Sequence, residues 1–178
     1  MKLPKFKYHP DPLATGSIEK SDKKCRCCGK KTGFIYAGPV YAEEELDHSI
    51  CPWCIADGSA AERYDATFTD ESGIGDGEVS VSDKIVQEVS QRTPGFAGWQ
   101  QERWLGCCDD AAAFLGPMGH VEVKKLGPAA VKAVRDESGL DGAEWEDYFN
   151  ELNRDSGPTA YIFRCLHCRG FRAYSDSH

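Results

Sequence analysis

Eight of the nine cysteines in this chain of 178 residues form four close pairs. The pairs are Cys25/Cys28, Cys51/Cys54, Cys107/Cys108 and Cys165/Cys168. Three of them have the spacing Cys-x-x-Cys, which lets both sulfurs point at one tetrahedral ion, and Zn²⁺ prefers closed sites made of four soft ligands. We therefore predict two structural Cys₄ zinc sites. Cys27 is left over and is expected to be an exposed thiol without a role.

The ligands of the second site are less tightly constrained by the sequence than those of the first. Cys165 and Cys168 need two further ligands, and the adjacent Cys107 and Cys108 are the only unused pair. A histidine is also a common zinc ligand. His120 or His167 could therefore replace one of these cysteines.

A chain rich in cysteine can also be a secreted protein held together by disulfides. Residues 1–24 contain no apolar segment and no small-residue cleavage site typical of a signal peptide. No stretch of the chain approaches the roughly 18 apolar residues that a membrane span requires. We expect a cytoplasmic, reduced protein without membrane insertion, and this setting favours metal ligation over disulfides.

The residues around the first two pairs predict a zinc finger. Gly29 follows Cys28 where a tight turn needs a positive φ, and residues 32–36 have the composition of a strand that leads into a Gly-Pro turn and a second short strand. Pro52 suits the first turn of a helix and Gly58 its end. This order is typical of a treble-clef finger; a zinc ribbon, with the second pair on another hairpin turn, is the alternative. A register in which Cys27 replaces Cys28 stays open, although it loses the Cys-x-x-Cys-Gly pattern.

Hydrophobic periodicity and turn residues predict the remaining elements. The alternation around Phe6 and Tyr8 predicts a short edge strand or an arm. We expect helices at 59–64, 81–92, 128–137 and 142–152, and a helix that begins at Asp109 and Asp110 after the adjacent cysteines. Strands are expected at 159–164 and 171–174, with Cys165 and Cys168 at their turn. A hairpin with a Cys-x-x-Cys turn is half of a zinc ribbon.

These elements together predict an α+β fold in which small zinc-finger-like modules, treble-clef or zinc-ribbon hairpins, combine with several short helices. Residues 69–77 are polar, glycine-rich and prone to turns, which makes them the best candidate boundary. We expect an N-terminal zinc-binding module at residues 1–68. Residues 69–178 would form a helical region with a C-terminal zinc-ribbon-like module, and the two parts are expected to pack as one unit.

The charge of the chain argues against a nucleic-acid partner. The formal net charge is −8, and two zinc-tetrathiolate centres would move it to about −12. Nucleic-acid affinity comes mostly from lysine and arginine contacts to phosphates. Local support for such binding is limited to a basic stripe of Lys23, Lys24, Arg26, Lys30 and Lys31. We therefore expect a protein partner and no nucleic acid. A basic surface on the partner would suit the negative charge of this chain.

The sequence also lacks the common catalytic motifs. It has no P-loop, no Gly-x-Gly-x-x-Gly, no His-Glu-x-x-His and no Gly-x-Ser-x-Gly. A non-enzymatic role is favoured, because closed Cys₄ sites leave no coordination position for a substrate. One alternative is a thiol-based redox or metal-handling protein that uses Cys27, Cys107 and Cys108. Another is a metal-dependent hydrolase that uses Asp109, Asp110 or a histidine.

Several segments resemble a known family of bacterial proteins. They are residues 3–16 (LPKFKYHPDPLATG), Cys28-Gly29, residues 36–41 (YAGPVY), residues 51–58 (CPWCIADG), residues 92–96 (RTPGF), Trp99 to Trp104, and residues 161–168 (YIFRCLHC). In these the chain is similar to the small CbrC-type proteins, over most of its length and less so at residues 65–90 and 119–157. The resemblance implies a bacterial cytosolic setting and a contribution to colicin or envelope-stress tolerance. It brings no catalytic residues. On this basis we expect a zinc-stabilised interaction protein involved in toxin or envelope-stress tolerance.

Overall fold

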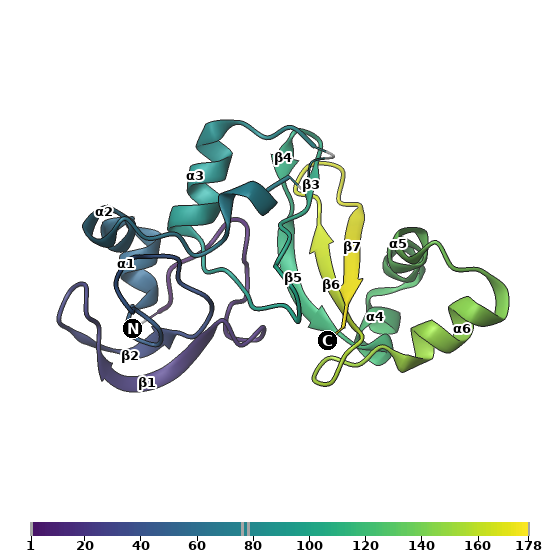
Figure 1. The fold of residues 1–178 in the computed structure, drawn as a ribbon, viewed down its shortest axis with the longest axis horizontal. Coiled ribbons are helices and arrows are strands. Elements are labelled where there is room, and N and C mark those ends of the chain that lie inside the picture. The colour runs from purple at the N-terminus through teal and green to yellow at the C-terminus, as the bar shows by residue number, and fades with distance from the viewer. Residues whose placement is uncertain (1, 76, 78, 178) are drawn as a thin grey trace.

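The computed structural model describes residues 2–75, 77 and 79–177. The elements follow one another along the long axis of the molecule in three groups (Figure 1). A two-stranded hairpin with two short helices lies at one end, a three-stranded sheet lies in the middle, and three helices lie at the other end. The mixed α+β class expected from the sequence is confirmed, with four-cysteine clusters on hairpin and short-helix modules.

The N-terminal group is built around an antiparallel hairpin of β1 (Ile18–Lys24) and β2 (Lys31–Tyr36), joined by the first Cys-x-x-Cys turn. The short helices α1 (Pro52–Ala56) and α2 (Ser59–Tyr64) follow it. Pro52 occupies the first turn of α1 as expected. Strand β1 is missed by the sequence reasoning because its residues are almost all polar. Ile18, opposite Tyr36, is its one buried residue.

The hydrophobic core of this group includes three cysteines. It is formed by Phe6, Ile18, Cys25, Ile35, Tyr36, Leu46, Ile50, Cys51, Cys54, Ile55, Ala60, Ala66 and Phe68. All of these side chains come from the first 68 residues. The division into two domains stays a prediction, because hydrogen bonds also join the two parts: the N–H of Phe68 donates to the carbonyl of Ser90, and the Arg92 guanidinium donates to the carbonyl of Ala56.

Between the N-terminal group and the sheet lie a 3₁₀ turn, η1 (Glu71–Gly73), and the helix α3 (Asp83–Arg92) (Figure 1). Helix α3 confirms the prediction from the spacing of its apolar residues. Its buried Val89 packs into the core of the central sheet. Its C-terminal residue Arg92 donates a hydrogen bond to the carbonyl of Ala56 in α1. The helix therefore links the two halves of the chain.

The central sheet has the order β5–β6–β7 and is antiparallel throughout. Its strands are β5 (Ala113–Met118), β6 (Thr159–Arg164) and β7 (Phe171–Asp176). The middle strand, β6, is buried on both faces. Tyr161 and Phe163 belong to an aromatic cluster, whereas Ala160 and Ile162 belong to the cluster that faces the C-terminal helices, as the alternation of side chains along a strand requires.

The helix expected to begin at Asp109 is wrong. The residues after the adjacent cysteines form a small hairpin of β3 (Gly106–Cys107) and β4 (Asp110–Ala111), and β5 follows directly. Cys108 and Asp109 make the turn, with φ values of 55° and 57°. Two-residue hairpin turns of this kind need positive φ at both central positions, a conformation that Asp tolerates better than most residues.

The last three helices are α4 (His120–Leu126), α5 (Pro128–Ser138) and α6 (Gly142–Glu151). They pack against the face of the sheet opposite the aromatic cluster (Figure 1). Helices α5 and α6 confirm the predicted segments, whereas α4 is missed. Tyr148 on α6 donates to the hydroxyl of Ser175 on β7, and that hydroxyl donates to Glu137 on α5. No helix in the described part of the chain is long and apolar enough to cross a membrane.

Of the two forms expected for the segment around Phe6 and Tyr8, an edge strand or an arm, the structure shows an irregular arm. Phe6 packs in the first core, and Tyr8 packs in the aromatic core of the sheet. Next to them His9 is fully buried, with Nδ1 2.7 Å from the carbonyl oxygen of Pro94 and Nε2 2.7 Å from the hydroxyl of Thr15. The arm therefore crosses between the two cores and is held there by buried polar contacts.

Candidate metal centres

The first four predicted cysteines form a tight cluster. The sulfurs of Cys25, Cys28, Cys51 and Cys54 all lie within 4.8 Å of one another. The Sγ–Sγ distances are 3.8 Å for Cys25–Cys54, 3.9 Å for Cys28–Cys51 and 3.6 Å for Cys51–Cys54. A tetrahedron with Zn–S bonds of about 2.3 Å has edges of about 3.8 Å. The sulfurs are thus spaced as the edges of a zinc-tetrathiolate site.

Backbone geometry shapes the first pair. In the turn between β1 and β2, the N–H of Gly29 donates to the carbonyl of Cys25, and Gly29 has the positive φ that the sequence predicts. The N–H of Cys51 donates to the Cys25 sulfur at 3.2 Å. The Cys51 thiol and the backbone N–H groups of Cys28, Cys51 and Cys27 lower the pKa of the Cys25 thiol to about 4, against the effect of burial. A thiolate is therefore stabilised here before any metal binds.

The second pair lies at the start of α1. Cys51 precedes the helix and Cys54 lies in its first turn. From the start of the helix, the pair faces the Cys25–Cys28 turn, which we call the first knuckle. The pKa of Cys51 is raised by its hydrogen bond with Cys25 and by burial, and burial also raises the pKa of Cys54. These buried thiols stay protonated next to one thiolate, whereas a divalent cation would compensate the charge of all four. The helical position of this pair matches the treble-clef prediction rather than the second hairpin of a zinc ribbon.

The other four cysteines form a second cluster at one end of the central sheet. Cys107 and Cys108 lie on the β3–β4 hairpin, and Cys165 and Cys168 lie on the β6–β7 turn. The four sulfurs lie within 4.8 Å of one another, and the Cys107 sulfur is 3.7 Å from those of both Cys108 and Cys168. The β3–β4 turn and the β6–β7 connection lie side by side at this end of the sheet (Figure 1). Adjacent cysteines can reach one centre here because Cys107 ends β3 and Cys108 lies within the turn that follows it, with a positive φ.

The β6–β7 turn repeats the geometry of the first knuckle. The N–H of Cys165 donates to the carbonyl of Gly170 at 2.8 Å, as that of Cys25 does to Lys30 at 2.9 Å. Burial raises the pKa of the Cys165 thiol, but the N–H groups of Cys168 and His167, each 3.4 Å from its sulfur, outweigh burial and lower the pKa to about 6. One sulfur in each cluster is thus stabilised as a thiolate by a knuckle.

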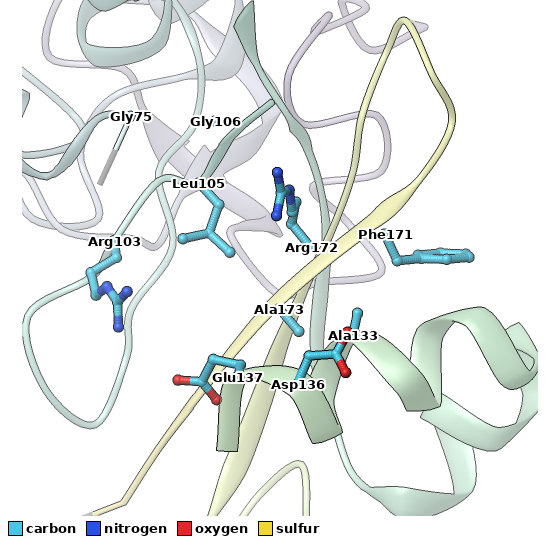
Figure 2. A pocket seen from close by; sticks show the side chains of 10 residues that line it. All are labelled: Gly75, Arg103, Leu105, Gly106, Ala133, Asp136, Glu137, Phe171, Arg172 and Ala173. Carbon is cyan, nitrogen blue, oxygen red and sulfur yellow. The ribbon is translucent and has the colours of Figure 1, made fainter. Parts of the chain in front are cut away.

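Cationic groups also reach the second cluster. Burial raises the pKa of Cys107 to about 12, although the hydrogen bond from Arg172 acts to lower it. Arg172 lines a cavity of about 180 Å³ between the residues before β3, helix α5 and strand β7. Figure 2 shows Arg172 and Arg103 on one side of this cavity and Asp136 and Glu137 of α5 on the other. No cysteine lines this cavity.

The histidines considered as substitute ligands lie outside both sulfur clusters. The Nδ1 of His120 is 3.2 Å from the carbonyl oxygen of Leu152. His167 lies between two cysteines of the β6–β7 turn, but its Nε2 is 2.9 Å from a carboxylate oxygen of Asp110. Each group of candidate ligands in the described residues therefore contains four cysteines and no histidine.

Cys27 is not the exposed thiol that the sequence predicts. Its side chain is half-buried against the first core, and its sulfur lies 3.6 Å from the hydroxyl of Ser59. The alternative register in which Cys27 replaces Cys28 is not seen, because Cys28 belongs to the cluster and Cys27 does not. Cys27 is a packing residue at the start of α2 rather than an outward-pointing thiol.

The structure contradicts disulfide pairing. All nine cysteines are unbridged, and sulfur–sulfur distances of 3.6–3.9 Å within the clusters are far longer than the roughly 2.05 Å of a disulfide. The two four-cysteine clusters are geometrically compatible with metal binding.

Sequence reasoning missed a buried carboxylate beside the second cluster. Asp110 accepts hydrogen bonds from the Tyr8 hydroxyl at 2.6 Å, the Lys7 ammonium at 3.1 Å and the N–H of Ala111 at 2.9 Å, and it contacts the His167 ring. Burial would raise its pKa, but these partners lower it. The carboxylate is enclosed by its donors, which argues against the hydrolase in which Asp110 acts on a substrate. No local pattern in the sequence points to this network, since its members are far apart along the chain.

A family model described as "Uncharacterised protein family (UPF0167)" matches residues 3–177. The chain belongs to the UPF0167 family. It is 51% identical over 181 residues to the UPF0167 protein MT2352 of Mycobacterium tuberculosis, covering 98% of this chain and 94% of that one. It is 47% identical over 167 residues to the UPF0167 protein PA1536 of Pseudomonas aeruginosa, covering 93% and 92% of the two chains. No solved structure matches this UPF0167 protein. The family membership is thus shown, and the metal centres rest on the geometry of the clusters.

Proposed function

We propose that this UPF0167 protein is a zinc-stabilised, non-enzymatic interaction protein that binds two Zn²⁺ ions, one in each four-cysteine cluster. The observation that supports this most directly is that the four sulfurs of each cluster lie within 4.8 Å of one another, with several pairs in both clusters at 3.6–3.9 Å. Four thiolates would complete the coordination of each ion and leave no position for water or substrate. The centres then hold hairpins and helices in place rather than performing chemistry.

The partner we propose is a protein with a basic surface, which this chain binds in the cytoplasm. The chain has 29 acidic and 21 basic residues, and complementary charge speeds the association of such partners and selects among them. The resemblance to CbrC-type proteins suggests a setting of colicin or envelope-stress tolerance. A specific form of this proposal is that the acidic surface binds a basic DNase domain. It fails if the purified protein leaves that nuclease fully active and does not bind it.

Native mass spectrometry of freshly purified protein tests the metal content, combined with the mass after denaturation and a count of reactive thiols. We expect two zinc ions per chain and no disulfide. After denaturation with a chelator, all nine cysteines should react with a thiol reagent. A metal-free folded protein, or a mass that shows disulfides in a freshly reduced preparation, would overturn the proposal.

A further inference from the structure

The two sulfur clusters differ in how far solvent reaches them. In the first, Cys25, Cys51 and Cys54 are 1%, 0% and 3% exposed, and Cys28 alone is an exposed side chain. In the second, Cys107 and Cys165 are buried, but Cys108 and Cys168 are both exposed. Their sulfurs lie within 4.8 Å of each other. The second cluster therefore presents a complete edge of its tetrahedron to solvent, whereas the first presents a single corner.

We propose that the second cluster is an exchangeable metal site, from which Cys108 and Cys168 pass the ion to a thiolate acceptor, while the first cluster is structural. The inference rests on the two metal sites of the proposed function and adds a second role to one of them. The acceptor is identified by its chemistry, as a Cys-x-x-Cys segment of another chain or a small thiol chelator.

An exchangeable site must keep its shape when the ion leaves, and the second cluster has the means to do so. The Asp110 carboxylate joins its two halves: Asp110 lies two residues after Cys108, and it contacts His167, which lies one residue before Cys168. The carboxylate also binds Tyr8 of the N-terminal arm, and its side chain is only 8% exposed. None of these contacts involves a sulfur. The approach of the two turns is therefore maintained by protein groups alone.

The strands that carry Cys165 and Cys168, half of the second cluster, are also independent of the ion. Strands β6 and β7 pair over six consecutive positions, from Thr159–Asp176 to Arg164–Phe171. Aromatic rings are packed beneath them, with the Phe114 and Phe163 centroids 5.0 Å apart and Trp104 fully buried. A three-stranded sheet with a hydrophobic face and covering helices is stable on its own. Loss of the ion here is expected to leave the fold intact.

The first cluster also has hydrogen bonds between its two halves, from the N–H of Arg26 to the carbonyl of Ser49 and from the Tyr64 hydroxyl to the carbonyl of Arg26. The elements that carry it are smaller, however. Its ligands lie on a two-stranded hairpin and on α1, a helix of five residues. Two-stranded hairpins and helices of this length are marginal in water. Three of its sulfurs belong to the buried core itself. Removing an ion from this cluster couples to unfolding of its surroundings, as in small zinc-dependent modules.

The transfer is a ligand exchange without oxidation or reduction. The acceptor thiolate forms a metal–sulfur bond as the bond to Cys168 or Cys108 breaks, and the released thiolate takes a proton from water. A second acceptor thiolate repeats the step at the other exposed cysteine. The bonds to Cys107 and Cys165 then break in the same way as further acceptor ligands or water take their places, and each released thiolate takes a proton from water. Zn²⁺ keeps its charge and four-coordination before and after the exchange.

The test follows zinc release from the fully loaded, full-length protein after addition of a chromogenic zinc chelator, and in parallel a metal-free Cys-x-x-Cys peptide. Circular dichroism and tryptophan fluorescence are recorded during release. We expect two phases, one ion leaving at least about tenfold faster than the other, because local opening needs less free energy than unfolding of a module. The fast phase should occur without a change in either spectrum, and the slow phase with one.

Alkylation of the wild-type protein identifies the site without relying on variants. After the fast phase, iodoacetamide should label Cys107, Cys108, Cys165 and Cys168, while the first cluster stays protected until the slow phase. In a matched pair of variants, Cys168→Ser should abolish the fast phase and leave the slow one, whereas Cys28→Ser should do the reverse.

The outcomes separate this inference from the proposed function. Two zinc ions that leave at one rate, fast-phase labelling at the first cluster, or a fast phase that survives in Cys168→Ser with labelling spread over both clusters would overturn the exchange site and keep the two zinc centres. A purified protein without zinc that also binds none when zinc is added would overturn both.

Discussion

The burial of His9 predicts a pH dependence of stability whose sign and size follow from its surroundings. The imidazole is fully buried, and burial lowers its pKa to about 4, against an ordinary value of 6.5. In the neutral ring, Nδ1–H donates to the carbonyl of Pro94, and Nε2 accepts from the Thr15 hydroxyl. The neutral form therefore belongs to the folded state, whereas the unfolded chain binds a proton below about pH 6.5.

The sign follows from proton uptake. Between pH 6.5 and pH 4 the unfolded chain binds one more proton at this position than the folded chain, so the free energy of unfolding falls as the pH falls. Each pH unit contributes about 1.4 kcal/mol, and the interval from pH 6.5 to 4.5 contributes about 3 kcal/mol. This stabilisation is complete above pH 6.5 and is lost progressively as the pH falls toward 4.

The assay is urea unfolding of wild type and His9→Asn at pH values from 7.5 to 4.5. Asparagine keeps a donor that can reach the Pro94 carbonyl but has no group that titrates in this range. The free energy of unfolding of wild type minus that of the variant should fall by about 3 kcal/mol across the series. If zinc is bound, its loss at acidic pH affects both proteins and cancels in this difference.

His48→Asn serves as the matched control, because the His48 side chain is 47% exposed and pairs with Glu19. A difference between wild type and His9→Asn that stays constant from pH 7.5 to 4.5 would refute the reasoning, as would an equal change for the His48 variant. Coincident transitions by circular dichroism and fluorescence are needed for each free energy to be defined.

Three further predictions concern packing and the metal clusters. Gly95→Ala should destabilise the protein by about 3 kcal/mol or more in urea unfolding, since its Cβ would lie 1.8 Å from the carbonyl oxygen of Phe68 and the backbone would have to move; a loss under about 1 kcal/mol would contradict this. Cys27→Ser should keep two zinc ions per chain by native mass spectrometry and change stability by about 1 kcal/mol or less, because Cys27 packs outside the cluster; a lost ion would assign it as a ligand. Asp110→Asn should weaken zinc binding by about tenfold to a hundredfold at the second cluster alone, measured by chelator competition, because the carboxylate orients both of its turns; an equal loss at both clusters would mean a general loss of fold.

Local patterns account for the elements that the sequence predicted correctly. The spacing of apolar residues located α3, α5 and α6, and runs of aromatic and β-branched residues located β6 and β7. Each of these signals lies within one element. The polar strand β1 gave no such signal. Its residues are almost all exposed along a two-stranded hairpin, so polar and apolar residues do not alternate in its sequence.

The helix expected after Cys108 shows where local and tertiary preferences conflict. Two aspartates before a run of alanines are typical of a helix N-terminus. In the folded chain, Phe114 pairs with Phe163 of β6, and its N–H donates to the carbonyl of Tyr8. Pairing with distant parts of the chain therefore makes this segment a strand. Asp110 accepts hydrogen bonds from buried partners instead of capping a helix.

The sequence by itself determined the fold class and the Cys-x-x-Cys pairs of the two clusters, because such a pair and the turn that shapes it are local features that need no distant partner. Only the tertiary structure decided that Cys107 and Cys108 meet the β6–β7 turn, that both histidines stay outside, and that Cys27 is half-buried. It also decided which sulfurs face solvent and that Asp110 holds the second cluster together. Distances between residues far apart in sequence, and the exposure of each side chain, depend on how the sheet, the hairpins and the N-terminal arm pack, and short-range spacing does not encode that packing.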